Sequence, residues 1–329
     1  MAPLTHDSVV ARASARAPLS RTTSGIGLAL GSALAFSLSG PLAKGLIDAG
    51  WTAGAAVTVR VLIAAAVLLV PAILTLRGRW SLLRRNAGLI LAYGLLAVAG
   101  CQLAYFNAVD RMQVGVALLI EFMSPVVVLT WMWLRHQQRP SRLTVAGAAT
   151  AVAGMVLVLD LVSGADLDGL GVVWAIGAML GAASYWIISA DDSSGLPGLV
   201  LAAGGLLSGG IVLLLAGLVG IVPFAVASND VVLADTDLPW WLAIGGLGIV
   251  TAALAYVLGI AAVRRLGSRL AAFVGLSEAV LGVIMAWLLL GEAPRGVQLV
   301  GGALVLTGVI AVRLGEPRIA QEAPIPTAT

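Results

Sequence analysis

The stretch from Gln113 to Pro140, QVGVALLIEFMSPVVVLTWMWLRHQQRP, places the carboxylate of Glu121 inside an apolar run long enough to cross a bilayer. A second stretch of the same kind, GSRLAAFVGLSEAVLGVIMAWLLLGEAP, runs from Gly267 to Pro294 and carries Glu278 near its centre. An ionisable group at membrane depth is costly, and it marks a functional site by default. The two stretches therefore predict a membrane protein whose functional site contains buried carboxylates.

The composition excludes a water-soluble globular protein. Of the 329 residues, 60% are hydrophobic and 11% are charged, and the mean hydropathy is +1.03. A soluble domain carries about 25% charged residues. The single cysteine, Cys101, lies in an apolar run, so neither a disulfide framework nor a cysteine-based metal cluster is expected.

Ten apolar segments are long enough to cross the hydrocarbon core as helices, which takes roughly 17–25 residues. They cover residues 25–43, 53–76, 87–109, 114–134, 143–162, 170–190, 199–222, 239–263, 268–290 and 296–312. Strands are not expected in the membrane, because a membrane barrel shows alternating segments of about ten residues and not continuous apolar runs. The sequence thus predicts an all-α integral membrane protein with ten transmembrane helices.

The positions of Lys and Arg predict the orientation, because short cytoplasmic loops carry an excess of these residues. If the N-terminus is inside, the outer segments hold only Lys44, Arg111 and Arg295 of the 19 basic residues, and Arg60 lies within a span. The external loops instead carry Asp160, Asp166, Asp168, Asp230, Asp235 and Asp237. We expect both termini to be cytoplasmic in a multi-pass protein of the cell (inner) membrane, with disordered tails at residues 1–23 and 315–329.

The sequence repeats itself at a distance of 154 residues. Identical residues pair without a gap: Ala108 with Ala262, Val109 with Val263, Arg111 with Arg265, Ala117 with Ala271, Trp133 with Trp287, Pro140 with Pro294, Gly147 with Gly301 and Gly154 with Gly308. Two five-helix halves, residues 24–162 and 169–314, follow from this pairing. Because five is an odd number, the halves must cross the membrane in opposite orientations. Inverted repeats are the usual construction of secondary transporters, with the substrate site near the midplane between the halves.

Two segments resemble a known family. YFNAVDRMQVGVALLIEFMSP, at Tyr105 to Pro125, and FVGLSEAVLGVIMAWLLLGEAPRGVQLVGGALVLTGVI, at Phe273 to Ile310, resemble the EamA-type branch of the drug/metabolite transporter superfamily. The resemblance covers roughly residues 25–314, and the segment from Ile120 to Pro125 is similar to that of the threonine/homoserine exporter subgroup. It implies ten helices in two inverted halves and the export of small amphipathic metabolites such as amino acids.

Glu121 and Glu278 are candidates for substrate binding or coupling, although each could instead be a structural carboxylate hydrogen-bonded within the bundle. Charged groups in spans tend to face a cavity or to pair with one another. Burial in an apolar environment disfavours the charged form of a carboxyl group, so either group could carry a proton in exchange for a substrate. The repeat pairs Glu121 with Gly275 and Ser124 with Glu278. The two carboxylates therefore lie about one helical turn out of symmetry.

Polar and aromatic side chains in the spans are further candidates for substrate binding, although such groups more often join helices to one another. They are Ser37, Gln102, Tyr105, Ser124, Trp174, Tyr185, Tyr256 and Ser277. Arg60, in the second span, and Pro125, which would kink the fourth, are assigned a structural or gating role. No spacing of residues predicts a metal site, a phosphate loop or a catalytic triad, so no cofactor and no catalytic residue are expected.

The sequence therefore predicts a secondary transporter that works by alternating access between its halves. Its expected partners are the bilayer and a small-molecule substrate, with protons as a hypothetical coupling ion; no nucleic acid is expected, and the chain would be a monomer or a homodimer. The competing class is an intramembrane enzyme that acts on a lipid or peptide. Such an enzyme would need a positioned nucleophile, base or metal cluster in the spans, and the sequence offers none.

Overall fold

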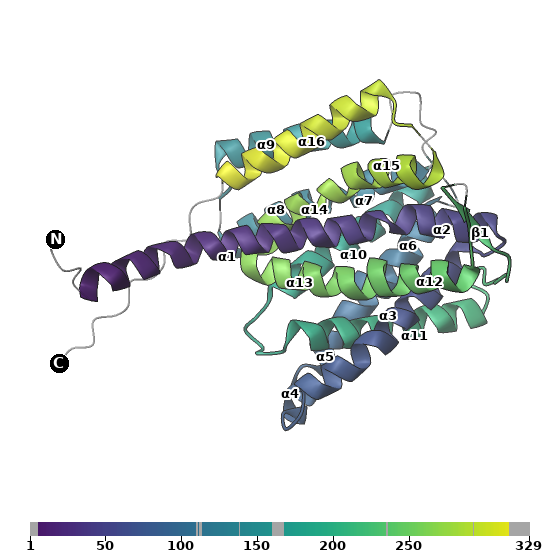
Figure 1. Cartoon of the computed structure of the whole chain (residues 1–329), viewed down its shortest axis with the longest axis horizontal. Coiled ribbons are helices and arrows are strands. Elements are labelled where there is room, and N and C mark those ends of the chain that lie inside the picture. The colour runs from purple at the N-terminus through teal and green to yellow at the C-terminus, as the bar shows by residue number, and fades with distance from the viewer. Residues whose placement is uncertain are drawn as a thin grey trace.

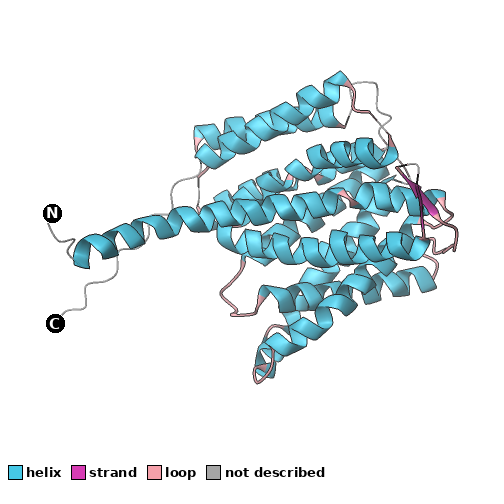
Figure 2. Ribbon diagram, in the orientation of Figure 1, coloured by secondary structure: helices cyan, strands magenta, loops and turns pink. Residues whose placement is uncertain are grey.

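The computed structural model of the chain describes residues 6–109, 111, 114–137, 139–159, 168–234, 236–291 and 293–315, and the side chains among them except those of 6–20, 109, 114 and 115. It is a bundle of roughly antiparallel helices in which α1 begins and α16 ends on the same side, which we call the terminal end (Figure 1). Helices make up nearly all of the secondary structure, and a small pair of strands lies at the opposite, hairpin end (Figure 2).

The elements follow one another in two comparable series. The first half contains α1 (His6–Ser37), α2 (Ser39–Asp48), α3 (Ala53–Thr75), α4 (Trp80–Arg85), α5 (Ala87–Ala92), the π-helix η1 (Tyr93–Gly100), α6 (Cys101–Val109), α7 (Val114–Glu121), α8 (Ser124–His136) and α9 (Arg142–Val158). The second half contains α10 (Gly169–Ala190), α11 (Gly198–Leu218), β1 (Val231–Leu233), β2 (Thr236–Leu238), α12 (Trp240–Gly248), the π-helix η3 (Ile249–Leu254), α13 (Ala255–Leu266), α14 (Ser268–Gly275), α15 (Ser277–Leu290) and α16 (Gly296–Gly315).

Nine helical stretches in the described part of the chain are at least 18 residues long and apolar enough to cross a membrane. A tenth apolar helix, α9, is shorter, and it occupies the place of the predicted span 143–162. The membrane-spanning, all-helical fold with ten apolar helices is thus confirmed. The predicted external residues Asp160, Asp166 and Asp235 lie outside the described residues.

The N-terminal segment differs from the sequence-based expectation. Helix α1 already begins at His6, whereas a disordered tail is predicted for residues 1–23. Ala and Arg, which recur in this segment, are strong helix formers that extend the first span. The tail predicted at 315–329 lies outside the described residues except for Gly315.

An antiparallel hairpin joins β1 to β2, with Val231 opposite Leu238. Its strands were not expected, because three residues are too few for a periodic signal. The backbone N–H of Ala234 donates to the carbonyl of Leu289 in α15, and Val231 packs against Gly45 in α2. The hairpin thereby ties α2 to the end of α15.

The structure shows the duplication as matching interruptions of the helices. The fourth transmembrane helix breaks between Glu121 and Ser124, and the ninth breaks between Gly275 and Ser277. The shift of 154 residues relates Glu121 to Gly275, so the two breaks coincide in the repeat. The π-helical segments η1 and η3 correspond in the same way, because residues 95–100 pair with residues 249–254. Both features are typical of functional sites in helical membrane proteins.

The fifth helices of the two halves, α9 and α16, pack directly against one another through glycines. A Cβ atom on Gly147 would lie 2.7 Å from the carbonyl oxygen of Gly308, and one on Gly154 would lie 2.7 Å from that of Gly301. Gly147 corresponds to Gly301 and Gly154 to Gly308, so this interface is itself pseudo-symmetric. Small residues let helix backbones approach closely in a membrane.

Equivalent helices α8 and α15 also end in the same way, with Gln137 and Gly291 in the left-handed conformation at φ of 55° and 69°. This conformation costs a non-glycine residue about 1–2 kcal/mol. Replacing Gln137 with glycine is therefore expected to raise the thermal unfolding midpoint in detergent, with a stabilisation of up to about 1 kcal/mol. Tryptophan fluorescence measures the midpoint. The reverse change, Gly291→Gln, should lower the midpoint. A lower midpoint for Gln137→Gly would contradict the left-handed conformation of residue 137.

Candidate functional site

A cavity of about 1080 Å³ lies between the two halves. Its walls come from α1, α2, α3, η1, α6, α7 and α8 of the first half and from α10, α13, α14, α15 and α16 of the second. Lys44 and Ile47 of α2 and Leu290 of α15 line it at the hairpin end, and Ala262, Ala271 and Ala272 line it toward the terminal end. Ile47 is 41% exposed, whereas Ala262, Ala271 and Ala272 are at most 1% exposed. The cavity is therefore open toward the hairpin end and bounded by buried residues toward the terminal end.

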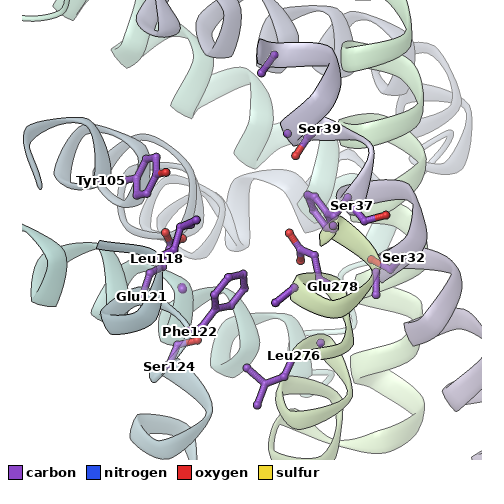
Figure 3. Close-up of a pocket in the computed structure, with 18 of the residues that line it drawn as sticks. Ser32, Ser37, Ser39, Tyr105, Leu118, Glu121, Phe122, Ser124, Leu276 and Glu278 are labelled. Carbon is purple, nitrogen blue, oxygen red and sulfur yellow. The ribbon is translucent and has the colours of Figure 1, made fainter. Parts of the chain in front are cut away.

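Most of the residues selected from the sequence line this one cavity. They are Ser37, Arg60, Gln102, Tyr105, Glu121, Ser124, Pro125, Tyr185, Tyr256 and Glu278. Glu121 and Tyr105 face Glu278 from the opposite wall (Figure 3). The cavity therefore collects polar groups from both halves, including Glu121 and Glu278, which are 157 positions apart in the sequence (278 − 121).

Two of the candidates lie elsewhere. Trp174 lines a separate groove of about 370 Å³, together with Leu96, Gly177 and Ser184, on the other side of α10. Ser277 is 3% exposed, and its hydroxyl donates to the carbonyl oxygen of Val274 at 2.6 Å. Ser277 thus closes the turn between α14 and α15, because helix ends leave carbonyl groups without intrahelical partners.

Glu121 occupies the C-terminal end of α7, immediately before the break. The thiol of Cys101 donates to its Oε1 at 3.5 Å and contacts the carbonyl oxygen of Ala178 at 3.4 Å. The C-terminal end of a helix carries a partial negative charge that favours cations. A carboxylate at this position strengthens that preference, so this wall suits a positively charged group.

Glu278 lies in the first turn of α15, immediately after the second break. A helix N-terminus carries a partial positive charge, which stabilises an acidic side chain there. Glu278 also interacts electrostatically with Glu121 and with Arg60. The two carboxylates therefore share one cavity but occupy opposite ends of half-helices.

Arg60 projects from α3 toward the other half of the bundle. Its Nη2 donates to the carbonyl oxygen of Thr251 in η3 at 3.3 Å, and its guanidinium carbon lies 5.9 Å from the centre of the Phe36 ring. In the described part of the chain, no ion pair within 4.0 Å joins Arg60 to Glu121 or Glu278. The guanidinium is therefore held by a carbonyl and a ring face and remains available to an anionic group in the cavity.

Aromatic rings form a continuous wall beside the charged groups. The Tyr256 ring lies 5.5 Å from that of Phe36 and 5.6 Å from that of Tyr185, which in turn lies 4.8 Å from Trp186, all in edge-on arrangements that aromatic pairs prefer. Sequence reasoning selected the two tyrosines but neither Phe36 nor the thiol of Cys101. These residues differ in no periodic way from other apolar residues of their spans, so the sequence carried no signal for them.

Two glycines beside the cavity allow aromatic rings to approach the helix backbone closely. A Cβ atom on Gly275 would lie 2.7 Å from the Trp186 ring. One on Gly259 would overlap the hydroxyl of Tyr185. Both rings therefore pack directly against helix backbone and take up less of the cavity than they would beside a larger residue.

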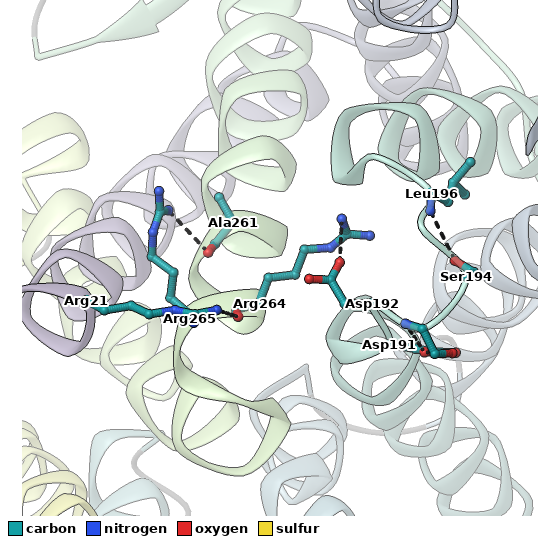
Figure 4. A network of polar contacts seen from close by, with 9 residues as sticks. Arg21, Asp191, Asp192, Ser194, Leu196, Ala261, Arg264 and Arg265 are labelled. Atoms are coloured by element: carbon teal, nitrogen blue, oxygen red, sulfur yellow. Dashed lines mark hydrogen bonds and ion pairs between the residues drawn. The ribbon is translucent and has the colours of Figure 1, made fainter. Parts of the chain in front are cut away.

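A polar cluster lies at the terminal end of the bundle (Figure 4). Arg264 Nη1 pairs with Asp192 Oδ1 at 2.9 Å, and Arg21 Nη2 donates to the Arg264 carbonyl oxygen at 3.4 Å. Beside this pair, hydrogen bonds from the hydroxyl and backbone N–H of Ser193 hold the pKa of Asp191 below its ordinary value. The cluster connects α1, α13 and the loop between α10 and α11.

Comparisons with known proteins agree with this architecture. The sequence profile of the EamA-like transporter family matches residues 23–160 and 169–314. YicL, an uncharacterized inner membrane transporter of Salmonella typhimurium, is 22% identical over 242 residues, which cover 73% of this chain and 77% of YicL. A crystal structure described only as that of a protein matches with a TM-score of 0.71 at 21% identity, over 89% of this chain and 97% of its own. This last similarity concerns the fold alone. Because the two family matches together cover most of its length, the chain belongs to the EamA-like transporter family and is a membrane transporter, not an intramembrane enzyme.

Proposed function

We propose that the chain exports small amphipathic metabolites such as amino acids, in exchange for protons, by alternating access. The observation that supports this most is the placement of Glu121, Glu278 and Arg60 around a single cavity, with each carboxylate beside the break of one of two equivalent helices. In secondary transporters the substrate and the coupling ion bind at such breaks near the membrane midplane. By analogy with YicL and by the distribution of basic residues, the protein resides in the inner membrane with both termini cytoplasmic.

The cavity offers a complementary group for each part of a zwitterionic amphipathic molecule. An ammonium group would bind between Glu121 and Glu278, and a carboxylate would bind at Arg60, since opposite charges in a medium of low dielectric attract strongly. The aromatic wall of Phe36, Tyr185 and Tyr256 would contact an apolar side chain. Ligand sites of this kind are mostly apolar, with a few placed polar groups that set the orientation.

Proton exchange gives the same carboxylates a second role. A carboxylate that faces a cavity accessible alternately from two sides can take up a proton on one side and release it on the other. If substrate ammonium and proton compete for Glu278, inward proton movement drives substrate outward. Because the two carboxylates are offset by about one helical turn, we expect one of them to bind the substrate and the other mainly to support it. Replacing each carboxylate in turn distinguishes these two roles.

Uptake into everted membrane vesicles tests the proposal, because uptake there corresponds to export from the cell. Vesicles containing the full chain and an acidic interior are expected to accumulate amino acids from a ¹⁴C-labelled mixture, and a protonophore should abolish the accumulation. Vesicles without the chain are the control. If vesicles that contain the folded chain accumulate no labelled amino acid above this control, the assignment to amino acids is wrong.

A further inference from the structure

The floor of the cavity is sealed by apolar contacts between the inner half-helices, those nearer the terminal end. Val128 of α8, Ala272 of α14 and Ala183 of α10 form one buried cluster, with exposed fractions of 0%, 1% and 2%. Trp186 and Met132 cover this cluster. Contact between α8 and α14 is thus the packing that separates the cavity from the terminal end.

The repeat defines the counterparts of this seal in the outer half-helices, α7 and α15. The shift of 154 residues takes Ala272 to Leu118 of α7, and it takes Val128 to Gly282 of α15. Both counterparts line the cavity, and a Cβ atom on Gly282 would meet nothing within 4 Å. α7, which carries the labelled Leu118 and Glu121, faces α15, which carries Glu278, across this space (Figure 3). Equivalent residues are therefore packed together at one end and separated at the other.

We propose that Leu118 and Gly282 form the outer gate of the transporter and close against one another when Val128 and Ala272 separate. The proposal rests on the alternating access proposed above. Because the halves share one sequence pattern in opposite orientations, each can adopt the packing of the other, which exchanges the sealed end with the open end. The side chain at 118 is a leucine where the inner seal has Ala272, and the residue at 282 is a glycine where the inner seal has Val128. The total apolar volume of the two seals is therefore similar, and close-packed interfaces require such matching.

The breaks beside the carboxylates supply the hinges for this exchange. Between Glu121 and Ser124 the backbone leaves the regular helical pattern: the N–H of Met123 bonds to the carbonyl of Ile120, three residues back. At the matching break, Leu276 bonds to Phe273 in the same way. Hinges in moving proteins are short element-terminal segments of this kind. Movement of α7 and α15 about these points would carry the gate residues and reorient both carboxylates together.

Disulfide cross-linking in membranes tests the gate. In a Cys101→Ala background, which removes the single native cysteine, one variant carries Leu118→Cys with Gly282→Cys and another carries Val128→Cys with Ala272→Cys. A disulfide requires Cα atoms within about 7 Å. Because Val128 and Ala272 belong to one buried cluster, we expect the inner pair to form a disulfide faster than the outer pair.

One result would overturn the gate: a folded variant, shown by elution as a single species and full alkylation in denaturant, whose outer pair forms no disulfide although the inner pair does. Labelled amino-acid uptake by the unsubstituted protein is measured in parallel. Cross-linking of both pairs without amino-acid uptake by that protein would support the gate while contradicting only the proposed substrate.

Discussion

Replacing Glu278 with glutamine is expected to reduce uptake of labelled amino acids driven by a pH gradient by about tenfold or more, with the protein still folded. Glutamine has almost the same shape but neither exchanges a proton nor attracts an ammonium group. Glu278 lines the cavity at the start of a half-helix and interacts with Glu121 and Arg60. The measurement is the initial rate of uptake into everted vesicles at an imposed acidic interior.

Two variants make this result interpretable. Asp237→Asn makes the same carboxylate-to-amide change at an exposed position of β2 that does not line the cavity, and it should retain most of the flux. Glu121→Gln shows whether the second carboxylate is equally required or mainly supports the first. Gradient-driven flux that is unchanged in both glutamine variants would rule out proton coupling through these carboxylates.

Replacing Gly154 with alanine is expected to destabilise the protein by about 1–3 kcal/mol, the typical cost of overpacking a close interface. The new methyl group would lie 2.6 Å from the backbone nitrogen of Val305 and 2.7 Å from the carbonyl oxygen of Gly301. Neither backbone atom can rotate away as a side chain can. The contact between α9 and α16 would therefore have to open, and with it the attachment of α16 to the first half.

Gly27 supplies the matched control, since it lies within α1 at a position where an added methyl group would meet nothing within 4 Å. Alanine is the better helix former by roughly 1 kcal/mol, so Gly27→Ala should leave the thermal midpoint unchanged or raise it. Both variants are compared in one detergent by their unfolding midpoints. Equal midpoints for Gly154→Ala and the unsubstituted protein would show that α9 and α16 pack less closely than described.

The fold could be predicted almost completely from the sequence, for reasons that are local. Continuous apolar runs identify the membrane spans because a helix satisfies its backbone groups within itself. Pairs such as Gly147 and Gly301, at a constant distance along the chain, identify the duplication. The short hairpin at Val231 to Leu238 escaped because it depends on contacts with Gly45 and Leu289, which are remote in sequence.

The candidate site could be predicted only in part. Charged groups such as Glu121 and Glu278 stand out in an apolar run, since their cost in a membrane has to be offset by a role or a partner. Aromatic residues do not stand out in this way. Trp174 and Trp186 lie on the same helix, yet one faces a surface groove and the other the cavity. Which face of α10 is turned inward depends on the neighbours that pack against it.

The sequence by itself therefore determined that the chain crosses the membrane as two duplicated sets of helices with carboxylates at their centre. Hydropathy and repeat distance are properties of the chain alone, and they suffice for that conclusion. Only the tertiary structure decided that Glu121 and Glu278 share one cavity with Arg60, and that the cavity reaches the hairpin end while the terminal end is sealed. The physical reason is that the inverted halves share one sequence pattern. The sequence is therefore nearly equally compatible with two packings, one open at each end of the bundle. The buried cluster of Val128, Ala183 and Ala272 at the terminal end distinguishes between them.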